Sequence, residues 1–153
     1  KTIYNVNCLN TDKYEYIYQE YLPGMEYTID VLCDMDSNPL AIVPRERLQT
    51  KAGISSKGRI VKNDFIEKSC FEICKFLKLK GPLCLQMKED DNGNPKFVEI
   101  NPRLGGSSYF ATLAGVNFLE IILDLVEGKE PVINKPNLVT ILRYFKEVVV
   151  WNY

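Results

Sequence analysis

The segment spanning residues 83–101 constrains the fold most, because it contains two strands and the turn that joins them. Its sequence, LCLQMKEDDNGNPKFVEIN, alternates apolar and polar side chains on either side of an Asn-Gly pair, which is a strong hairpin signal. With DNGN (91–94) as the turn, Asp90 lies opposite Pro95, and the numbers of every directly opposed pair sum to 185. Gln86 is therefore expected to face Glu99.

Side chains along a strand alternate between the two faces of a sheet, so this register gives the hairpin an apolar face and a polar face. The face expected to be core carries Leu83, Leu85, Met87, Lys96, Val98 and Ile100. The polar face carries Cys84, Gln86, Lys88, Phe97, Glu99 and Asn101. Directly opposed residues lie about 5 Å apart at Cβ, so Gln86, Glu99 and Asn101 are expected to offer three oxygen ligands to one small cation. Mg²⁺ suits such a set, although a change of one residue in loop length would separate Gln86 from Glu99.

The residues that follow the hairpin favour an anion beside this cation. Pro102 ends the strand, and Arg103 offers a planar fork of donors suited to phosphate or carboxylate. After Gly105–Gly106 a helix is expected to begin near Ser107 or Ser108, and its N-terminus adds N–H donors. A cation, a guanidinium and amide donors side by side are what phosphoryl transfer needs, because that chemistry is mostly positioning and charge neutralisation.

A plainer interpretation of the same residues stays open. A Glu-x-Asn pair on a strand is most often a solvent-facing stripe, and Asn-Pro-Arg is an acceptable turn. The position of Gln86 opposite Glu99, with apolar side chains on the other face, favours the functional interpretation.

The first 44 residues predict an antiparallel meander. Two segments rich in Tyr and Ile, residues 14–22 and 25–34, alternate on either side of Pro23-Gly24 and are expected to be strands. A second turn, DMDSNP, leads to a third short strand at residues 40–44. Residues 45–60 contain five basic residues, two glycines and two serines, and are expected to form a solvated, mobile loop.

From Asn63 the hydrophobic period becomes helical. The apolar stripe consists of Phe65, Ile66, Cys70, Ile73, Cys74 and Leu77. Asp64 is expected to cap this helix, with Glu67 completing a capping box. Gly81 and Pro82 are expected to end it.

The last third of the sequence predicts further helix and one strand. Residues 118–128 form a helical pattern, with Asn117 as the cap and Gly128 as the stop. Residues 138–150 are expected to form a closing strand. The order of elements predicts an α+β domain with a largely antiparallel sheet and helices packed on one face.

Composition excludes several classes of function. A chain of 153 residues suits one domain, and nineteen basic against twenty acidic residues give a net charge of -1, so no global field draws it onto nucleic acid or an anionic membrane. The apolar runs are far shorter than the roughly 20 residues of a bilayer crossing, and no signal peptide is recognised. A cytoplasmic location is expected from the cysteines, which have no disulfide-framework spacing. The absence of histidine excludes imidazole mechanisms, including a Ser-His-Asp triad, within this chain.

The five cysteines are odd in number and mostly lie in apolar segments. They are Cys8, Cys33, Cys70, Cys74 and Cys84. We interpret them as reduced core residues. Cys70 and Cys74 lie one helical turn apart, but the lack of histidine and of Cys-x-x-Cys argues against zinc.

Two motifs together resemble a known family. VEINPRLGGSS, preceded by CLQMKEDDNGNPKF, resembles the C-terminal half of the ATP-grasp fold. YQEYLPGMEYTIDVL resembles the nucleotide hinge of that fold and the strand that follows it. The motifs occur in family order, about 60 residues apart, and cover most of residues 15–128. The nearest likeness is to the large subunit of carbamoyl-phosphate synthetase and related carboxylate-amine ligases.

The resemblance implies roles for particular residues. Glu99 and Asn101 are expected to hold magnesium and the ATP phosphates, with Gln86 as a further ligand of the synthetase type. Arg103 is expected to be the catalytic contact to the transferring phosphoryl group or the acyl phosphate.

The hinge and the basic segment complete the implied site. Glu20 is expected to accept from the adenine amino group, Tyr21 and Leu22 to present backbone to the ring, and Glu26 to bind the ribose hydroxyls. The basic segment of the family lies over the active site, so phosphate or substrate contacts are open for Arg45, Arg47 and Lys51. A solvated rim is the plainer interpretation of those three.

The resemblance implies an ATP-dependent ligase that uses Mg²⁺ or Mn²⁺. Such an enzyme activates a small carboxylate as an acyl phosphate for attack by an amine or ammonia. The alternative is a catalytically degenerate module with a binding or assembly role. The family's upstream half, with a phosphate-gripping lysine and a glycine-rich lid, is not recognised in residues 1–153, so the chain is expected to be a single partial domain that is inactive alone. A homodimer is left open.

Overall fold

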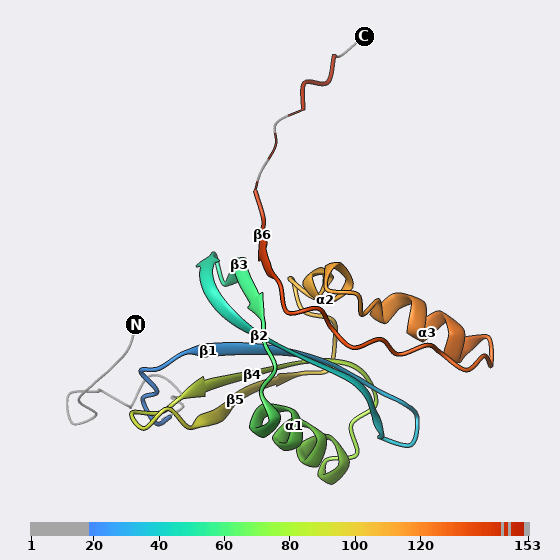
Figure 1. Ribbon diagram of the computed structural model, residues 1–153, viewed down its shortest axis with the longest axis horizontal. Helices are drawn as coiled ribbons and strands as arrows, with labels where there is room; N and C mark the ends of the chain where they lie inside the picture. The colour runs from blue at the N-terminus through green and yellow to red at the C-terminus, as the bar shows by residue number, and fades with distance from the viewer. Residues whose placement is uncertain (1–18, 145, 147, 152–153) are drawn as a thin grey trace, which may run out of the picture.

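The computed structural model describes residues 19–144, 146 and 148–151, and it consists of one antiparallel sheet with helices on both sides (Figure 1). The elements in chain order are β1 (Glu26–Cys33), β2 (Pro39–Lys51), β3 (Ile54–Ile60), α1 (Asp64–Phe76), β4 (Gly81–Glu89), β5 (Pro95–Asn101), α2 (Tyr109–Leu113), α3 (Phe118–Val126) and β6 (Thr140–Leu142). The strand order is β5-β4-β1-β2-β3-β6, and each neighbouring pair is antiparallel. The predicted α+β class with an antiparallel sheet is therefore confirmed.

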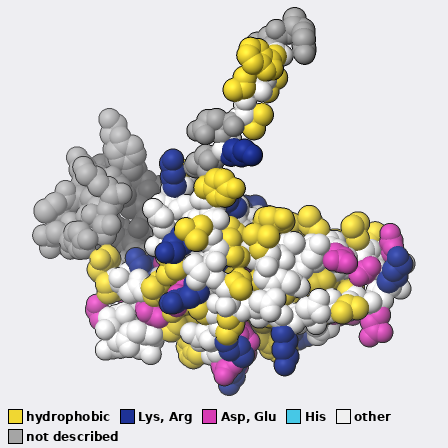
Figure 2. Space-filling view, turned by 45° about the horizontal axis from the view of Figure 1, so that its top comes forward, with side chains coloured by type: hydrophobic (Ala, Val, Ile, Leu, Met, Phe, Trp, Pro, Cys, Tyr) yellow, Lys and Arg dark blue, Asp and Glu magenta, His cyan; other side chains and the backbone are white. Residues whose placement is uncertain are grey.

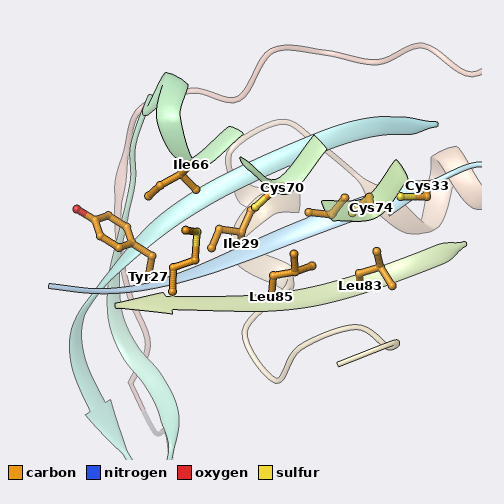
Figure 3. Close-up of a cluster of buried hydrophobic side chains, with 10 residues drawn as sticks. Tyr27, Ile29, Cys33, Ile66, Cys70, Cys74, Leu83 and Leu85 are labelled. Carbon is orange, nitrogen blue, oxygen red and sulfur yellow. The ribbon is translucent and has the colours of Figure 1, made fainter. Parts of the chain in front are cut away.

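The first core lies between the sheet and α1 (Figure 3). Alternate residues of β1, from Tyr27 to Cys33, point to this face and meet the buried helix residues Ile66, Cys70 and Cys74. The predicted apolar face of β4 packs here as well, because Leu83, Leu85 and Met87 are all buried. Burial of apolar area on this scale is the main stabilising contribution to the fold.

The second core lies on the opposite face of the sheet, under α2 and α3. Its buried members are Leu32, Ala41, Val43, Ile60, Phe110, Ala111, Ala114, Val116, Phe118 and Ile121. The expectation that helices pack on one face only is therefore wrong in that detail: α1 covers one face, whereas α2 and α3 cover part of the other. The part of this second face that no helix covers carries the polar residues of the candidate site.

The limits of α1 differ from the prediction by one turn at most. Asn63, not Asp64, is the cap: its side chain accepts a hydrogen bond from the Ile66 backbone N–H at 3.1 Å. Glu67 accepts a hydrogen bond from the Asn63 N–H at 3.4 Å, so the reciprocal contact of a capping box forms, but with the acid four residues after the cap instead of three. The helix ends before Lys78, whose φ is 53°, whereas Gly81 begins β4 rather than ending the helix.

Residues 45–60 are not a mobile loop but most of the hairpin formed by β2 and β3. The two residues between the strands, Ala52 and Gly53, have φ angles of 50° and 76°, as a two-residue hairpin turn requires. This polar segment can lie within the sheet because its arginines pair with carboxylates on neighbouring strands. Arg59, for example, donates to Glu46 at 2.7 Å.

Two predicted strands lie near the ends of the chain. Of the strand predicted at residues 14–22, residues 14–18 lie outside the described residues, and residues 19–22 form no regular strand. Of the described residues of the closing strand, only those of β6 form a strand, which pairs with β3. Beyond it the described residues extend away from the sheet and expose the apolar side chains of Val148–Trp151 (Figures 1 and 2). Helices of the length and apolarity needed to span a bilayer do not occur in the described residues.

The four described cysteines are free and buried, as expected, whereas Cys8 lies outside the described residues. Burial raises the pKa of the Cys70 thiol to about 12, which keeps this thiol protonated at neutral pH. Among the described residues, no group of three His, Cys, Asp or Glu side chains could hold a metal, so Cys70 and Cys74 are core residues.

Candidate functional site

The β4–β5 hairpin has the predicted register at the predicted site. Gln86 lies directly opposite Glu99, and Cys84 lies directly opposite Asn101. Nearer the turn the register shifts by one, because a bulge occurs between Gln86 and Met87. The site-proximal half of the prediction is therefore confirmed.

The turn-proximal half of the predicted register is wrong. Pro95 pairs with Glu89 rather than with Asp90. Asp90 belongs to the turn instead, since its Oδ1 accepts from the backbone N–H groups of Asn92 and Asn94, at 2.9 Å each. The turn is thus one residue longer than DNGN, and the bulge restores the alignment before Gln86.

The bulge also changes the face of the residues between it and the turn. Phe97 pairs with Met87, so it lies on the α1 side of the sheet, where it lines a shallow pocket together with Ile73 and Phe76, and not on the polar face. Lys96 pairs with Lys88 and not with a core residue, and its Nζ contacts Glu20. These two assignments correct the predicted faces.

The register places the three predicted cation ligands on the same face of the β4–β5 hairpin. Gln86 and Asn101 are half-buried and line a cavity of about 250 Å³, whereas Glu99 is exposed and is not among the residues that line it. Across β4, Thr28 of β1 lies directly opposite Gln86. One carboxylate and two amide oxygens fit Mg²⁺, which prefers oxygen and completes its shell with water and phosphate. The donor set is therefore suited to a metal–phosphate complex rather than to a fully protein-bound metal.

The cavity lies between the β2–β3 hairpin, the strands β1, β4 and β5, and the loop from Arg103 to Ser107. Its volume is below the roughly 300–1,000 Å³ of sites for drug-sized ligands. A phosphate or a small carboxylate fits such a volume, but a whole nucleotide does not.

The loop between β5 and α2 approaches the sheet closely at one glycine. A Cβ on Gly105 would lie 2.8 Å from the Cys84 Sγ, closer than any side chain tolerates. Arg103 at the start of the loop is exposed and donates from Nη1 to the Leu104 carbonyl at 3.0 Å. The helix that follows, α2, has five residues and is preceded by Ser108 as its cap, so it begins where the sequence predicts. Gly105, Gly106 and Ser107 before it line the cavity, and the anion contact expected of their N–H groups stays a prediction.

A buried ion pair forms the floor beside the cavity. The Arg45 Nε donates to the Asp30 Oδ2 at 3.0 Å, and the two side chains are only 2% and 1% exposed. Arg45 also donates to the Ser55 hydroxyl at 3.3 Å and lies over the Phe110 ring, 5.7 Å from its centre. Burial raises the pKa of the Asp30 carboxyl, and Arg45 opposes this rise. The Asp30 Oδ1 is buried without a hydrogen-bond partner in the described structure.

Sequence reasoning missed Asp30. The feature of the sequence that points to Asp30 is its position in the strand EYTIDVLC. Alternation along this strand places the Asp30 carboxylate on the same face of the sheet as Thr28 and Leu32.

The second arginine of the basic segment is also buried. Arg47 forms an ion pair with Glu26 and donates from Nη2 to the Gly53 carbonyl at 2.7 Å. Its side chain is 9% exposed and lines the cavity. The interpretation of Arg45 and Arg47 as a solvated rim is therefore wrong, whereas Lys51 is exposed.

The hinge segment lies at the end of the sheet where β1 begins. Glu20 is exposed and forms an ion pair with Lys96 at 2.8 Å, Tyr21 is 55% exposed and Leu22 is half-buried. Glu26, the predicted ribose contact, is half-buried and is two residues from Thr28 on the polar face.

Glu89 of β4 holds this hinge in place and was not identified from the sequence. Its carboxylate accepts from the Tyr27 hydroxyl at 2.7 Å and from the Met25 N–H at 3.2 Å, while its carbonyl accepts from the Gly24 N–H at 3.0 Å. Burial, with the nearby Glu89 carboxylate, raises the pKa of the Tyr27 hydroxyl far above its ordinary value. Tyr27 therefore remains a donor at any physiological pH.

Solved structures with the same fold include three enzymes. N5-carboxyaminoimidazole synthetase from Staphylococcus aureus, complexed with ADP, matches 74% of this chain with a TM-score of 0.57 and 16% identity. A biotin carboxylase–βγ-ATP complex from Campylobacter jejuni matches 78% with a TM-score of 0.57 and 16% identity. The phosphoribosylaminoimidazole carboxylase ATPase subunit from Aquifex aeolicus matches 69% with a TM-score of 0.56 and 14% identity.

The matched regions make up 32%, 29% and 35% of those three proteins, so the chain spans about a third of their length. No curated protein matches the sequence significantly. A family model described as "ATP-grasp in the biosynthetic pathway with Ter operon" matches residues 12–148. Because that match spans most of the chain and the sheet has the fold of these ATP-grasp structures, the chain belongs to this ATP-grasp family.

Proposed function

We propose that the chain is the C-terminal part of an ATP-grasp domain, and that it supplies the metal- and phosphate-binding side of an ATP-dependent ligase. Such a ligase activates a small carboxylate as an acyl phosphate, which an amine or ammonia then attacks. The observation that supports this proposal most is the placement of Gln86 opposite Glu99, with Asn101 next to an arginine-lined cavity. The glutamine at position 86 favours a ligase of the carbamoyl-phosphate synthetase type.

Each residue of the site has a distinct role in this proposal. Glu99 provides the charged oxygen ligand, and Gln86 and Asn101 provide neutral ones. Bound Mg²⁺ supplies charge neutralisation to the ATP phosphates. Arg103, exposed at the mouth of the cavity, donates hydrogen bonds to the transferring phosphoryl group, where negative charge must be stabilised. The protein needs no nucleophile and no histidine for this chemistry.

The hinge holds the rest of the nucleotide. Glu20, Tyr21 and Leu22 contact the adenine, and Glu26 contacts the ribose. Two of these residues have protein partners that the nucleotide must share or replace, namely Lys96 for Glu20 and Arg47 for Glu26. Glu89 accepts hydrogen bonds from the Gly24 and Met25 backbone N–H groups and from the Tyr27 hydroxyl, so the end of the hinge is preorganised.

The substrate and partner classes follow from the site. The small polar cavity suits a carboxylate, and a net charge of -1 gives no general attraction for nucleic acid or anionic membranes. The remaining two-thirds of an ATP-grasp enzyme would come from the rest of the same protein. The chain alone is then expected to bind ATP weakly and not to turn it over.

The test is ADP formation by the whole protein with ATP, Mg²⁺ and a panel of small carboxylates and amines. Glu99→Gln keeps the shape of the side chain but removes the charge, and should reduce ADP formation at least about 100-fold. Glu127→Gln, on an exposed helix end, is the matched control and should have no effect. A residual ATPase rate that Glu99→Gln leaves unchanged would remove Glu99 from the site. Metal-dependent nucleotide binding without any turnover would favour the degenerate module instead.

A further inference from the structure

A shallow, mainly apolar groove, here the α1–β5 groove, lies between α1 and the strand at one edge of the described sheet. Its volume is about 400 Å³, and it is lined by Ser69, Glu72, Ile73, Phe76 and Phe97. Phe76 is 81% exposed and Phe97 is 37% exposed, so two aromatic rings are open to solvent at one place. Exposed apolar side chains that gather in this way mark an interaction site, whereas scattered single ones do not.

The surroundings of the α1–β5 groove are basic. Three lysines are exposed at the end of α1 that closes the groove, namely Lys75, Lys78 and Lys80. Residues 62–80 contain five lysines but only three acidic residues. Glu72, the acid of the groove lining, has the Lys68 ammonium 3.9 Å from its carboxylate. A partner that fits this groove should therefore combine apolar side chains with acidic ones.

The outer face of α3 carries exposed apolar side chains at helical spacing. This α3 stripe consists of Leu119, Leu123 and Val126, which are 60%, 60% and 79% exposed. The inner face of the same helix is apolar as well, since Phe118 and Ile121 are buried in the second core. A helix that is apolar on both faces is typical of one that is covered on both sides.

Acidic side chains flank the α3 stripe. The three residues that follow the stripe residues by one position are Glu120, Asp124 and Glu127. Residues 117–130 contain four acidic residues and one lysine. Apolar anchors at positions i, i+4 and i+7 are those of a helix that lies in a groove, and the acids complement the lysines around the α1–β5 groove. The α3 stripe therefore has the properties that this groove requires of a partner.

The two surfaces cannot meet within one molecule. The first core places α1 on one face of the sheet, and the second core places α3 on the other (Figure 1). The groove can therefore receive α3 only from a second copy. Like charges oppose a contact of groove with groove or of α3 with α3. A groove-to-α3 contact is head to tail and leaves one free surface on each copy, so further copies can add until a ring closes.

We propose that the chain self-associates head to tail, with the α3 stripe of one copy seated in the α1–β5 groove of the next. Leu123, at the centre of the stripe, fills the groove beside Phe76 and Phe97, and the acids of α3 approach the lysines at the end of α1. A single helix face buries less area than a permanent interface, so the association is weak and reversible. It is independent of the proposed function, because the candidate site lies on the other face of the sheet.

Sedimentation equilibrium of the whole protein, without nucleotide or metal, measures this association. The average mass of the wild type is expected to rise with protein concentration, through the dimer to larger species. Phe76→Ala removes an anchor of the groove and Leu123→Ala removes one of the stripe, and both side chains are exposed, so the fold does not depend on them. Each variant should associate at least about tenfold more weakly than the wild type.

A mixture of the two variants gives the sharpest result. Phe76→Ala retains an intact α3 stripe and Leu123→Ala retains an intact groove, so the equimolar mixture keeps one productive contact. It should form a dimer with the wild-type affinity and no larger species, whereas a folding defect is not repaired by mixing. Phe71→Ala is the matched control and should associate like the wild type, because Phe71 is exposed on α1 but is not part of the groove lining.

Three results would each overturn the proposal. The first is a wild type that stays monomeric up to about 1 mM, which leaves no interface of measurable strength. The second is an association that Phe76→Ala or Leu123→Ala leaves unchanged, or that Phe71→Ala weakens equally. The third is a mixture of Phe76→Ala and Leu123→Ala that associates no better than either variant alone.

Discussion

Breaking the buried ion pair between Asp30 and Arg45 should destabilise the protein more than any exposed substitution. With side chains 1% and 2% exposed, neither charge can be screened by water if its partner is removed. Removing one member of such a pair typically costs about 3–5 kcal/mol, because an uncompensated charge stays buried. That is a large part of the 5–15 kcal/mol by which ordinary domains are stable.

A double-mutant cycle isolates this effect. Asp30→Leu leaves Arg45 with only the Ser55 hydroxyl and the Phe110 ring, whereas Arg45→Met leaves the Asp30 carboxylate with no donor. The double variant replaces both charges by apolar side chains and is expected to be within about 2 kcal/mol of the wild type. The coupling free energy should therefore reach several kcal/mol.

The assay is equilibrium unfolding in urea, monitored by circular dichroism. Arg59→Met is the matched control, because its pair with Glu46 is exposed and should contribute no more than about 1 kcal/mol. Single variants at Asp30 and Arg45 that cost no more than this control would refute the reasoning. Additive effects in the double variant would refute it as well.

Three further predictions follow from the fold. Gly105→Ala places a Cβ 2.8 Å from the Cys84 Sγ and should lower the free energy of unfolding by about 1–3 kcal/mol. Adding Cys84→Ala should restore much of this loss. Equal stability of wild type and Gly105→Ala in urea would contradict the close approach. Asn63→Ala should cost about 1 kcal/mol in the same assay through loss of the α1 cap, while Asp64→Ala should cost less. Backbone N–H donors of Asn94 and then of Asn92 lower the pKa of the Asp90 carboxyl, so its stabilisation is present above about pH 4, the unfolded-state value, and is lost as the pH falls through the lowered pKa. The difference in urea midpoint between wild type and Asp90→Asn should accordingly shrink on acidification, and a difference that grows would contradict the sign.

The β4–β5 hairpin shows what a single sequence can and cannot predict. Alternation and the Asn-Gly turn predicted Gln86 opposite Glu99 correctly, although the predicted turn was one residue too short. They were not sufficient to place Phe97, because the turn includes Asp90 and the extra residue is absorbed by a bulge. The two deviations cancel before Gln86, and no local signal for a bulge exists in this stretch.

The β2–β3 hairpin was missed for a different reason. A composition this polar is compatible with a strand here because carboxylates on neighbouring strands neutralise the arginines. Composition alone cannot show such a partner, because the partner is distant in sequence. Arg45 and Asp30 are 15 residues apart, and Arg47 and Glu26 are 21 apart. The Ala52 turn residue, with a positive φ, is also an uncommon choice that turn rules do not anticipate.

The most direct test of the metal site uses Mn²⁺ in place of Mg²⁺ with a non-hydrolysable ATP analogue, and follows side-chain amide resonances by NMR. We expect substoichiometric Mn²⁺ to broaden the side-chain NH₂ signals of Gln86 and Asn101 and to leave the signal of Gln49 sharp, and we expect Glu99→Gln to abolish the broadening. Sharp Gln86 and Asn101 signals at saturating Mn²⁺–nucleotide, or broadening that persists in Glu99→Gln, would show that these residues do not hold the metal.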